Sequence, residues 1–242
     1  MTTVLKLGGS VVTEKDDPET VDRVALERAA GALADRDDIV LVHGGGSFGH
    51  HHAAKYGVST TQGTDDPAAI RAIHGAMRRL NAAVVRALAE AAVPALPVHP
   101  MSTADRDGSG DLTLPTGQVE TMLEEGFVPV LHGDGVVHAG KGATVLSGDE
   151  LVVVLAEALA ADRVGVCSAV EGVYDDDGSV IDRIESFESA AGTLGGSDAT
   201  DVSGGMAGKV RALLGLDAPA HVFDLDGLEA FLDGDEPGTR IE

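Results

Sequence analysis

Short apolar segments alternate with longer amphipathic segments along almost the whole chain. Six short segments rich in branched residues predict buried strands: Val4–Leu7, Ile39–Val42, Ala95–Val98, Val128–Leu131, Val164–Cys167 and Ala220–Phe223. Apolar residues at helical spacing predict helices over Val21–Ala34, Pro67–Ala92, Gly117–Glu125, Asp149–Ala161 and Gly205–Leu214. Strands that alternate with helices predict an α/β fold, an open αβα sandwich with a mainly parallel central sheet.

Two segments between these elements are rich in turn-forming residues. Gly133–His138 is predicted to turn a hairpin, and Asp175–Ser179 is typical of a loop or a second hairpin turn. Neither an internal repeat nor a low-complexity linker divides the 242 residues. We therefore expect a single domain over residues 1–242.

The net charge of the chain argues against some classes of binding partner. Forty acidic residues against 17 lysines and arginines give a formal net charge of −23. Such a chain repels nucleic acid and anionic membranes, so we expect it to bind neither. The acidic residues are spread along the sequence, which favours adaptation to high salt over an ordinary acidic surface.

The location of the protein is predicted from three features. No run approaches the roughly 18 apolar residues of a membrane span. A strand-like segment begins at once, without the basic and apolar regions of an export signal. The single Cys167 fits a reducing compartment. We therefore expect a cytoplasmic protein.

Three glycine-rich turns are candidates for phosphate binding. The sequence LGGS at 7–10 follows the first strand, HGGGSFGH at 43–50 follows the second, and SGGM at 203–206 precedes the helix that carries Lys209. Lys6 directly precedes the first turn. Glycine lets backbone N–H groups approach an anion closely, and a helix that follows adds a favourable dipole.

A dinucleotide site is the alternative interpretation of the second turn. Gly44, Gly46 and Gly49 match G-x-G-x-x-G after a strand, with Asp65 or Asp66 near the expected distance. That motif normally follows the first strand of its domain, however, and it leaves the two lysine-bearing turns unexplained. Phosphate binding by all three turns is favoured.

These motifs resemble the amino-acid kinase superfamily over essentially the whole chain. KLGGS at 6–10 and VHGGG at 42–46 are similar to its phosphate loops, and SGD at 147–149 to the position of its lysine-organising aspartate. AVEGVY at 169–174 is similar to its nucleotide-side segment, although Glu171 stands where an aspartate is usual. The resemblance implies an acceptor side over residues 1–160 and a nucleotide side over 161–242.

Within the superfamily, GSFGH at 46–50 is similar to the isopentenyl phosphate kinase branch and to the related fosfomycin kinases. The resemblance implies isopentenyl phosphate as acceptor, ATP with Mg²⁺ as co-substrate, and a homodimer. A kinase acting on an antibiotic or a carboxylate acceptor, or a non-catalytic nucleotide sensor, remains the alternative.

The resemblance also implies roles for individual residues. We expect Lys6, Lys15 and Lys209 to neutralise charge on the phosphates, His50 to bind the acceptor phosphate, and Asp149 to position the lysines. The expected acceptor site comprises Gly8, Gly9, Gly45, Gly46, Gly49, His50, Gly148, Ile73 and Met77. The expected nucleotide site comprises Lys6, Gly8, Ser10, Glu171, Gly172, Tyr174, Asp175, Gly204, Gly205 and Lys209.

Two of these expectations come from helical geometry. Ile73 and Met77 lie on one face of the helix predicted over Pro67–Ala92, so they line either an apolar pocket or the core. The run His50–His52 does not form a metal site, because adjacent helix residues point about 100° apart. His51 and His52 are expected at the surface.

Overall fold

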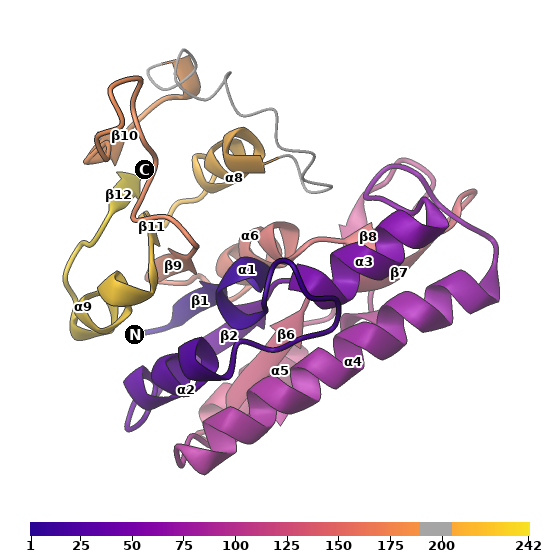
Figure 1. Cartoon of the computed structure of the whole chain (residues 1–242), viewed down its shortest axis with the longest axis horizontal. Helices are drawn as coiled ribbons and strands as arrows, with labels where there is room; N and C mark the ends of the chain where they lie inside the picture. Colours follow the sequence, from indigo (N-terminus) through magenta and orange to yellow (C-terminus); the bar gives the residue numbers. More distant parts are fainter. Residues whose placement is uncertain (189–204) are drawn as a thin grey trace.

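The computed structural model describes residues 1–188 and 205–242, and its architecture is a sandwich of helices around a twisted sheet (Figure 1). The sheet has eight strands in the order β10 (Arg183–Ile184), β12 (Thr239–Ile241), β11 (Ala220–Phe223), β9 (Arg163–Cys167), β1 (Thr3–Leu7), β2 (Ile39–His43), β6 (Val128–His132) and β3 (Ala95–Pro97). Neighbouring strands are parallel, except β11 and β12. The predicted α/β sandwich is confirmed.

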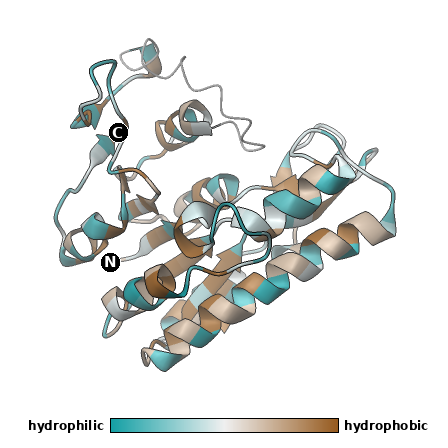
Figure 2. Cartoon of the chain, viewed as in Figure 1, coloured by the Kyte–Doolittle hydropathy of each residue, from teal (hydrophilic) through white to brown (hydrophobic). Residues whose placement is uncertain are grey.

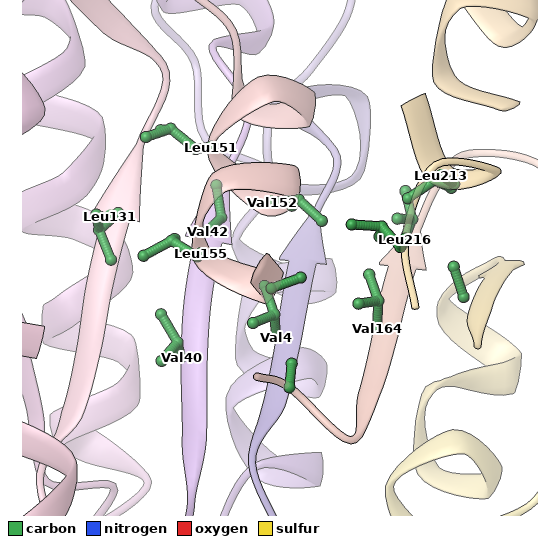
Figure 3. Close-up of a cluster of buried hydrophobic side chains, with 14 of the residues drawn as sticks. Val4, Val40, Val42, Leu131, Leu151, Val152, Leu155, Val164, Leu213 and Leu216 are labelled. Atoms are coloured by element: carbon green, nitrogen blue, oxygen red, sulfur yellow. The ribbon is translucent and has the colours of Figure 1, made fainter. Parts of the chain in front are cut away.

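Alternate residues of the buried strands face two separate apolar cores. Val4, Val40 and Val42 face the helices α5 (Gly117–Glu124), α6 (Gly148–Ala158) and α8 (Gly205–Leu213). Figure 3 shows Leu151, Val152 and Leu155 of α6 over these valines. Leu5, Leu7 and Leu41 face the opposite layer, made of α1 (Gly9–Val12), α2 (Arg23–Ala32), α4 (Pro67–Glu90) and α9 (Leu228–Asp233). The apolar strands are therefore covered on both sides, with hydrophilic residues on the outer faces of the helices (Figure 2).

Helix starts follow from local capping. The side chain of Asp22 accepts the N–H of Ala25 before α2, and Ser147 accepts that of Glu150 in α6. Asp66 caps α4, whose first residue is proline. Among the described residues no helix is long and apolar enough to cross a bilayer.

A second sheet lies at the far end of α3 (Gly46–Tyr56) and α4. Its strand order is β5 (Leu112–Thr113), β4 (Asp105–Arg106), β7 (Asp134–His138) and β8 (Gly142–Leu146). The described residues also form two short 3-10 helices, η1 (Pro100–Ser102) and η2 (Leu225–Gly227).

The predicted hairpin turn over Gly133–His138 is wrong, because Asp134–His138 forms the first strand of a hairpin. The turn follows that strand, where Gly140 and Gly142 have φ of 80° and 73°. These left-handed conformations favour glycine, whereas Val136 and Val137 suit an extended strand. The predicted turn over Asp175–Ser179 is confirmed, with the N–H of Asp175 donating to the carbonyl of Ser179 at 2.8 Å.

Candidate active site

The carboxyl ends of four parallel strands meet at one edge of the main sheet. Leu7 pairs with His43 and Cys167, and His43 pairs with His132. The backbone ladder continues one residue further, since Gly8 N–H donates to the carbonyl of Cys167 at 2.8 Å. The first two glycine-rich turns leave the sheet at this edge, where open α/β sheets bind their ligands.

These two turns are packed backbone against backbone. A Cβ on Gly9 would lie 2.1 Å from the nitrogen of Gly46, and one on Gly44 would lie 2.5 Å from the nitrogen of Gly9. Gly46 has φ of 46°, and its Cβ would lie 2.1 Å from Oγ1 of Thr13. Larger residues would separate the turns, so glycine here serves close approach as well as anion binding.

The second turn leads into α3, whose first residues carry unused donors. In the described part of the chain, the N–H groups of Gly45 and Gly46 make no hydrogen bond to the protein. The N–H of Gly49 instead donates to the carbonyl of Gly45 at 2.8 Å. A Cβ on Gly49 would lie 2.8 Å from the sulfur of Met77. Gly49 therefore packs α3 on α4 and already uses its N–H, while Gly45 and Gly46 offer the free donors; the acceptor-binding role of Gly49 stays a prediction.

Two lysines from distant parts of the chain converge on one carboxylate. Lys6 Nζ on β1 lies 2.6 Å from Oδ1 of Asp149 at the start of α6. Lys209 Nζ on α8 lies 3.2 and 3.3 Å from the two oxygens of the same carboxylate. A Cβ on Gly148 would lie 3.2 Å from Cε of Lys6, so this glycine makes room for the lysine stem.

The Lys6, Asp149 and Lys209 cluster is largely shielded from water. The side chains of Lys6, Asp149 and Lys209 are 7%, 16% and 13% exposed. Burial alone would raise the pKa of Asp149, but the two ammonium groups lower it to about 2. One carboxylate thus holds two cations side by side.

Three further predicted site residues, Ser10, Lys15 and His50, are exposed. Ser10 lies on α1, directly after the first glycine turn, and His50 lies in the second turn of α3. Lys15 lies in the loop after α1, and within the described residues it makes no hydrogen bond or ion pair. The structure does not bring it into contact with Lys6.

The predicted nucleotide segment packs against the first residue of β12. The N–H of Val173 donates to Oγ1 of Thr239 at 2.8 Å, and buried Gly172 has no room for a side chain there. Glu171 and Tyr174 are exposed, whereas Oδ1 of Asp175 accepts two N–H groups of its own turn.

The third glycine turn is only partly described. Gly205 begins α8 with φ of 62°. Ser203 and Gly204 lie outside the described residues.

The apolar acceptor candidates are both buried on α4. Met77 is 1% exposed and belongs to the core beneath the second glycine turn. Ile73 is 4% exposed and packs with Ala53, Val58 and Val145 in a small separate cluster between α3, α4 and β8. Their role as pocket residues stays a prediction.

Sequence reasoning did not assign the buried histidines behind the glycine turns. His43 Nδ1–H donates to the carbonyl of Gly44 at 3.1 Å, which leaves its Nε2 to accept from Asn81 Nδ2 at 3.2 Å. Burial lowers the pKa of His43 to about 4, so this imidazole is neutral at physiological pH. It supports the second turn without adding charge.

The neighbouring imidazoles continue this arrangement. His132 Nδ1–H donates to the carbonyl of Gly133 at 2.9 Å, and its Nε2 accepts from His99 Nδ1 at 2.9 Å. Burial lowers the pKa of His132 to about 3. His74 Nδ1 lies 2.9 Å from buried Asp134. The sequence LHGD at 131–134 carries His132 and Asp134, whereas His74 and His99 have no local signal of their own.

His52 corrects a further expectation. It was predicted at the surface, yet its side chain is 15% exposed and its Nε2 lies 2.5 Å from Oε1 of Glu19. The loop after α1 folds back over α3, a tertiary contact that helical spacing does not reveal. His51 is exposed as predicted.

Comparison with known proteins agrees with this geometry. The model of the amino acid kinase family matches residues 1–216. The isopentenyl phosphate kinase of Haloferax volcanii is 63% identical over 98% of this chain and 97% of its own length. That of Methanothermobacter thermautotrophicus is 35% identical over 87% of this chain and 85% of its own. A crystal structure of an isopentenyl phosphate kinase superposes with a TM-score of 0.85 at 29% identity, over the full length of both chains. The chain therefore belongs to the amino acid kinase family, in its isopentenyl phosphate kinase branch.

Proposed function

We propose that the protein transfers the γ-phosphoryl group of ATP to isopentenyl phosphate, giving isopentenyl diphosphate and ADP. The observation that carries the proposal is the convergence of Lys6 and Lys209 on Asp149, directly beside two glycine turns with free N–H donors. The similarity to relatives named isopentenyl phosphate kinase supports the choice of acceptor.

The reaction joins two polyanions, so electrostatics dominates its barrier. An oxygen of the acceptor phosphate forms a bond to the γ-phosphorus while the bond to the β,γ-bridging oxygen breaks. The acceptor needs no base, because a phosphate monoester with a second pKa near 6 is already ionised at neutral pH. The protein has to hold both phosphates in line and neutralise the charge on the transferred group.

The residues take roles that follow from their positions. Lys6 bridges the transferred group and the acceptor, Lys209 contacts the β- and γ-phosphates, and Asp149 holds the two ammonium groups in position beside each other. Gly45 and Gly46 donate their N–H groups to the acceptor phosphate, together with His50. Lys15 approaches from its exposed loop.

Several finer expectations belong to the same proposal. Residues 1–160 hold the acceptor and 161–242 the nucleotide. Mg²⁺ arrives with ATP, since it usually binds through substrate phosphates. The active form is a homodimer in the cytoplasm of a cell with high internal salt. A melting temperature that does not change from dilute buffer to molar KCl would contradict the expected adaptation to high salt.

An acceptor panel tests the reaction. The protein is incubated with ATP and, separately, isopentenyl phosphate, isopentenol, fosfomycin or N-acetylglutamate, and the products are identified by phosphorus NMR. We expect a diphosphate from isopentenyl phosphate alone. Turnover of a carboxylate or of fosfomycin instead would replace the proposed acceptor, and ATP binding without turnover would favour a nucleotide sensor.

A lysine pair tests the placement of the site. Lys6→Ala is expected to lower kcat by about 10²–10³-fold with smaller changes in KM, because it acts on charge in the transition state. Lys141→Ala is the matched control, since Lys141 Nζ donates only to the carbonyl of Thr61 at an exposed turn. A larger loss in the control than in Lys6→Ala would refute the placement.

A further inference from the structure

One carboxylate fastens the loop that carries Lys15 to two helices. Oε1 of Glu19 lies 2.5 Å from Nε2 of His52 on α3. Both carboxylate oxygens accept Nη2–H groups of Arg79 on α4, each at 2.8 Å. We call Glu19, His52 and Arg79 the loop clamp.

The loop is also closed at its base. Thr13 and Val21 form an antiparallel bridge, so residues 14–20 project as a short excursion between them. Oγ1 of Thr13 accepts the N–H of Ser47 at 3.0 Å, and the N–H of Glu19 donates to the carbonyl of Ser47 at 3.3 Å. Both arms of the loop therefore contact Ser47 in the first turn of α3, one turn before His50.

The backbone of Glu19 is held in an unfavourable conformation. Its φ is 54°, in the left-handed region that residues with a β-carbon rarely adopt. Such a conformation costs free energy and persists only where its surroundings hold it. Here the conformation turns the carboxylate inward to α3 and α4, whereas Glu14, Asp16 and Asp17 of the same loop are exposed.

The contact between α3 and α4 does not rest on the clamp alone. α3 and α4 already pack through the buried side chains of Phe48, Met77 and Leu80. The side chain of Arg79 is 56% exposed, and ion pairs in such positions contribute little to the free energy of unfolding. The strain at Glu19 is thus retained for local order in the loop.

We propose that the loop clamp positions Lys15 over the start of α3, where the acceptor phosphate binds. This inference rests on the proposed function, which assigns Lys15 to the phosphates. Glu19 and Arg79 are positioning residues: they act on the acceptor through Lys15 and leave the nucleotide side, around Lys209, unaffected.

A double-mutant cycle tests this coupling. Steady-state kinetics with isopentenyl phosphate and ATP are measured at one salt concentration for Lys15→Ala, Glu19→Gln and the double variant. We expect Glu19→Gln to lower kcat/KM for the acceptor by about 10-fold, with an unchanged KM for ATP. In the Lys15→Ala background, Glu19→Gln should not lower kcat/KM further, because both substitutions remove the same contact between Lys15 and the acceptor phosphate.

Two further variants separate positioning from folding. Asp233→Asn is the matched control, since Asp233 pairs with Arg36 at 2.5 Å on another part of the surface, and we expect wild-type kinetics. Arg79→Gln removes the exposed half of the clamp and should reproduce the loss seen with Glu19→Gln at an unchanged Tm. Should Glu19→Gln lower Tm, Arg79→Gln decides the question.

Three results would overturn the proposal. The first is a kcat/KM for the acceptor that is lowered in Lys15→Ala but is the same in Glu19→Gln as in the Asp233→Asn control. The second is a double variant in which the losses of kcat/KM from Lys15→Ala and Glu19→Gln multiply, since Glu19 would then act independently of Lys15. Wild-type kinetics in Lys15→Ala would instead remove Lys15 from the proposed site, which is a distinct failure of the proposed function.

Discussion

Replacing Asp149 by asparagine keeps the shape of the side chain and removes its charge. The carboxylate lies 2.6 Å from the ammonium group of Lys6 and 3.2 Å from that of Lys209. At about 3 Å and an effective dielectric constant of about 20, each attraction is worth about 5 kcal/mol before desolvation is subtracted. Removing one partner of a buried pair costs about 3–5 kcal/mol net. Since these side chains retain some contact with water, we expect a loss of about 3 kcal/mol in the free energy of unfolding.

Thermal unfolding measures this loss. A chain of this size loses about 2–4 °C of Tm per kcal/mol, so Asp149→Asn should melt about 6–12 °C below the wild type. Added ATP should narrow the gap, because its phosphates supply negative charge to the ammonium groups that have lost the Asp149 carboxylate. We also expect kcat to fall by about 10²-fold, since the lysines lose their fixed positions.

A control on the same helix isolates the effect. Glu157 is exposed on α6, and Glu157→Gln should change neither Tm nor kcat. If Asp149→Asn matched this control in both measurements, the carboxylate would not organise the lysines. A Tm gap that ATP left unchanged would show that the lost charge acts on the fold and not on the phosphate site.

Three further predictions concern the acceptor side and the buried histidines. His50→Ala should lower kcat/KM for the acceptor by about 10²-fold and His51→Ala should not, so equal effects in the same assay would contradict the assignment. Ile73→Ala should shift the kcat/KM ratio toward longer prenyl phosphates by about 10–200-fold; lower stability with the same chain-length preference would mean that this residue is only core. Because the folded-state pKa of His43 is about 4 against 6.5 for the free group, the unfolded chain binds a proton first as the pH falls. The contribution of His43 to the free energy of unfolding should then fall by on the order of 3 kcal/mol between pH 6.5 and 4. Urea unfolding of the wild type and of His43→Gln at several pH values measures this loss. Equal dependence of the free energy of unfolding on pH in the two proteins would refute the prediction.

The sequence alone determined the main layers of the fold. Branched apolar runs such as Ile39–Val42 and Val164–Cys167 are buried on both faces wherever they lie in a parallel sheet, so their pattern is visible locally. Helix α3 escaped the periodicity analysis, because its glycines and three histidines carry little apolar signal.

For the site, the sequence indicated which residues bind phosphate but not how they meet. Glycine turns after strands and Lys6 are local signals, and a resemblance added Asp149 and Lys209. Only the sheet order places residues 6, 149 and 209 within one cluster, since β1 lies between β2 and β9 at the centre of the sheet.

Contacts between helices and loops were decided by tertiary structure alone. Gly49 looked like a phosphate donor and His52 like a surface residue, yet one packs on Met77 and the other pairs with Glu19. Local sequence fixes backbone preference and apolar pattern, which depend on neighbours along the chain. The partner of a side chain or an N–H group often lies on another helix or loop. For Gly49 and His52, that partner is set by how α1, α3 and α4 pack together.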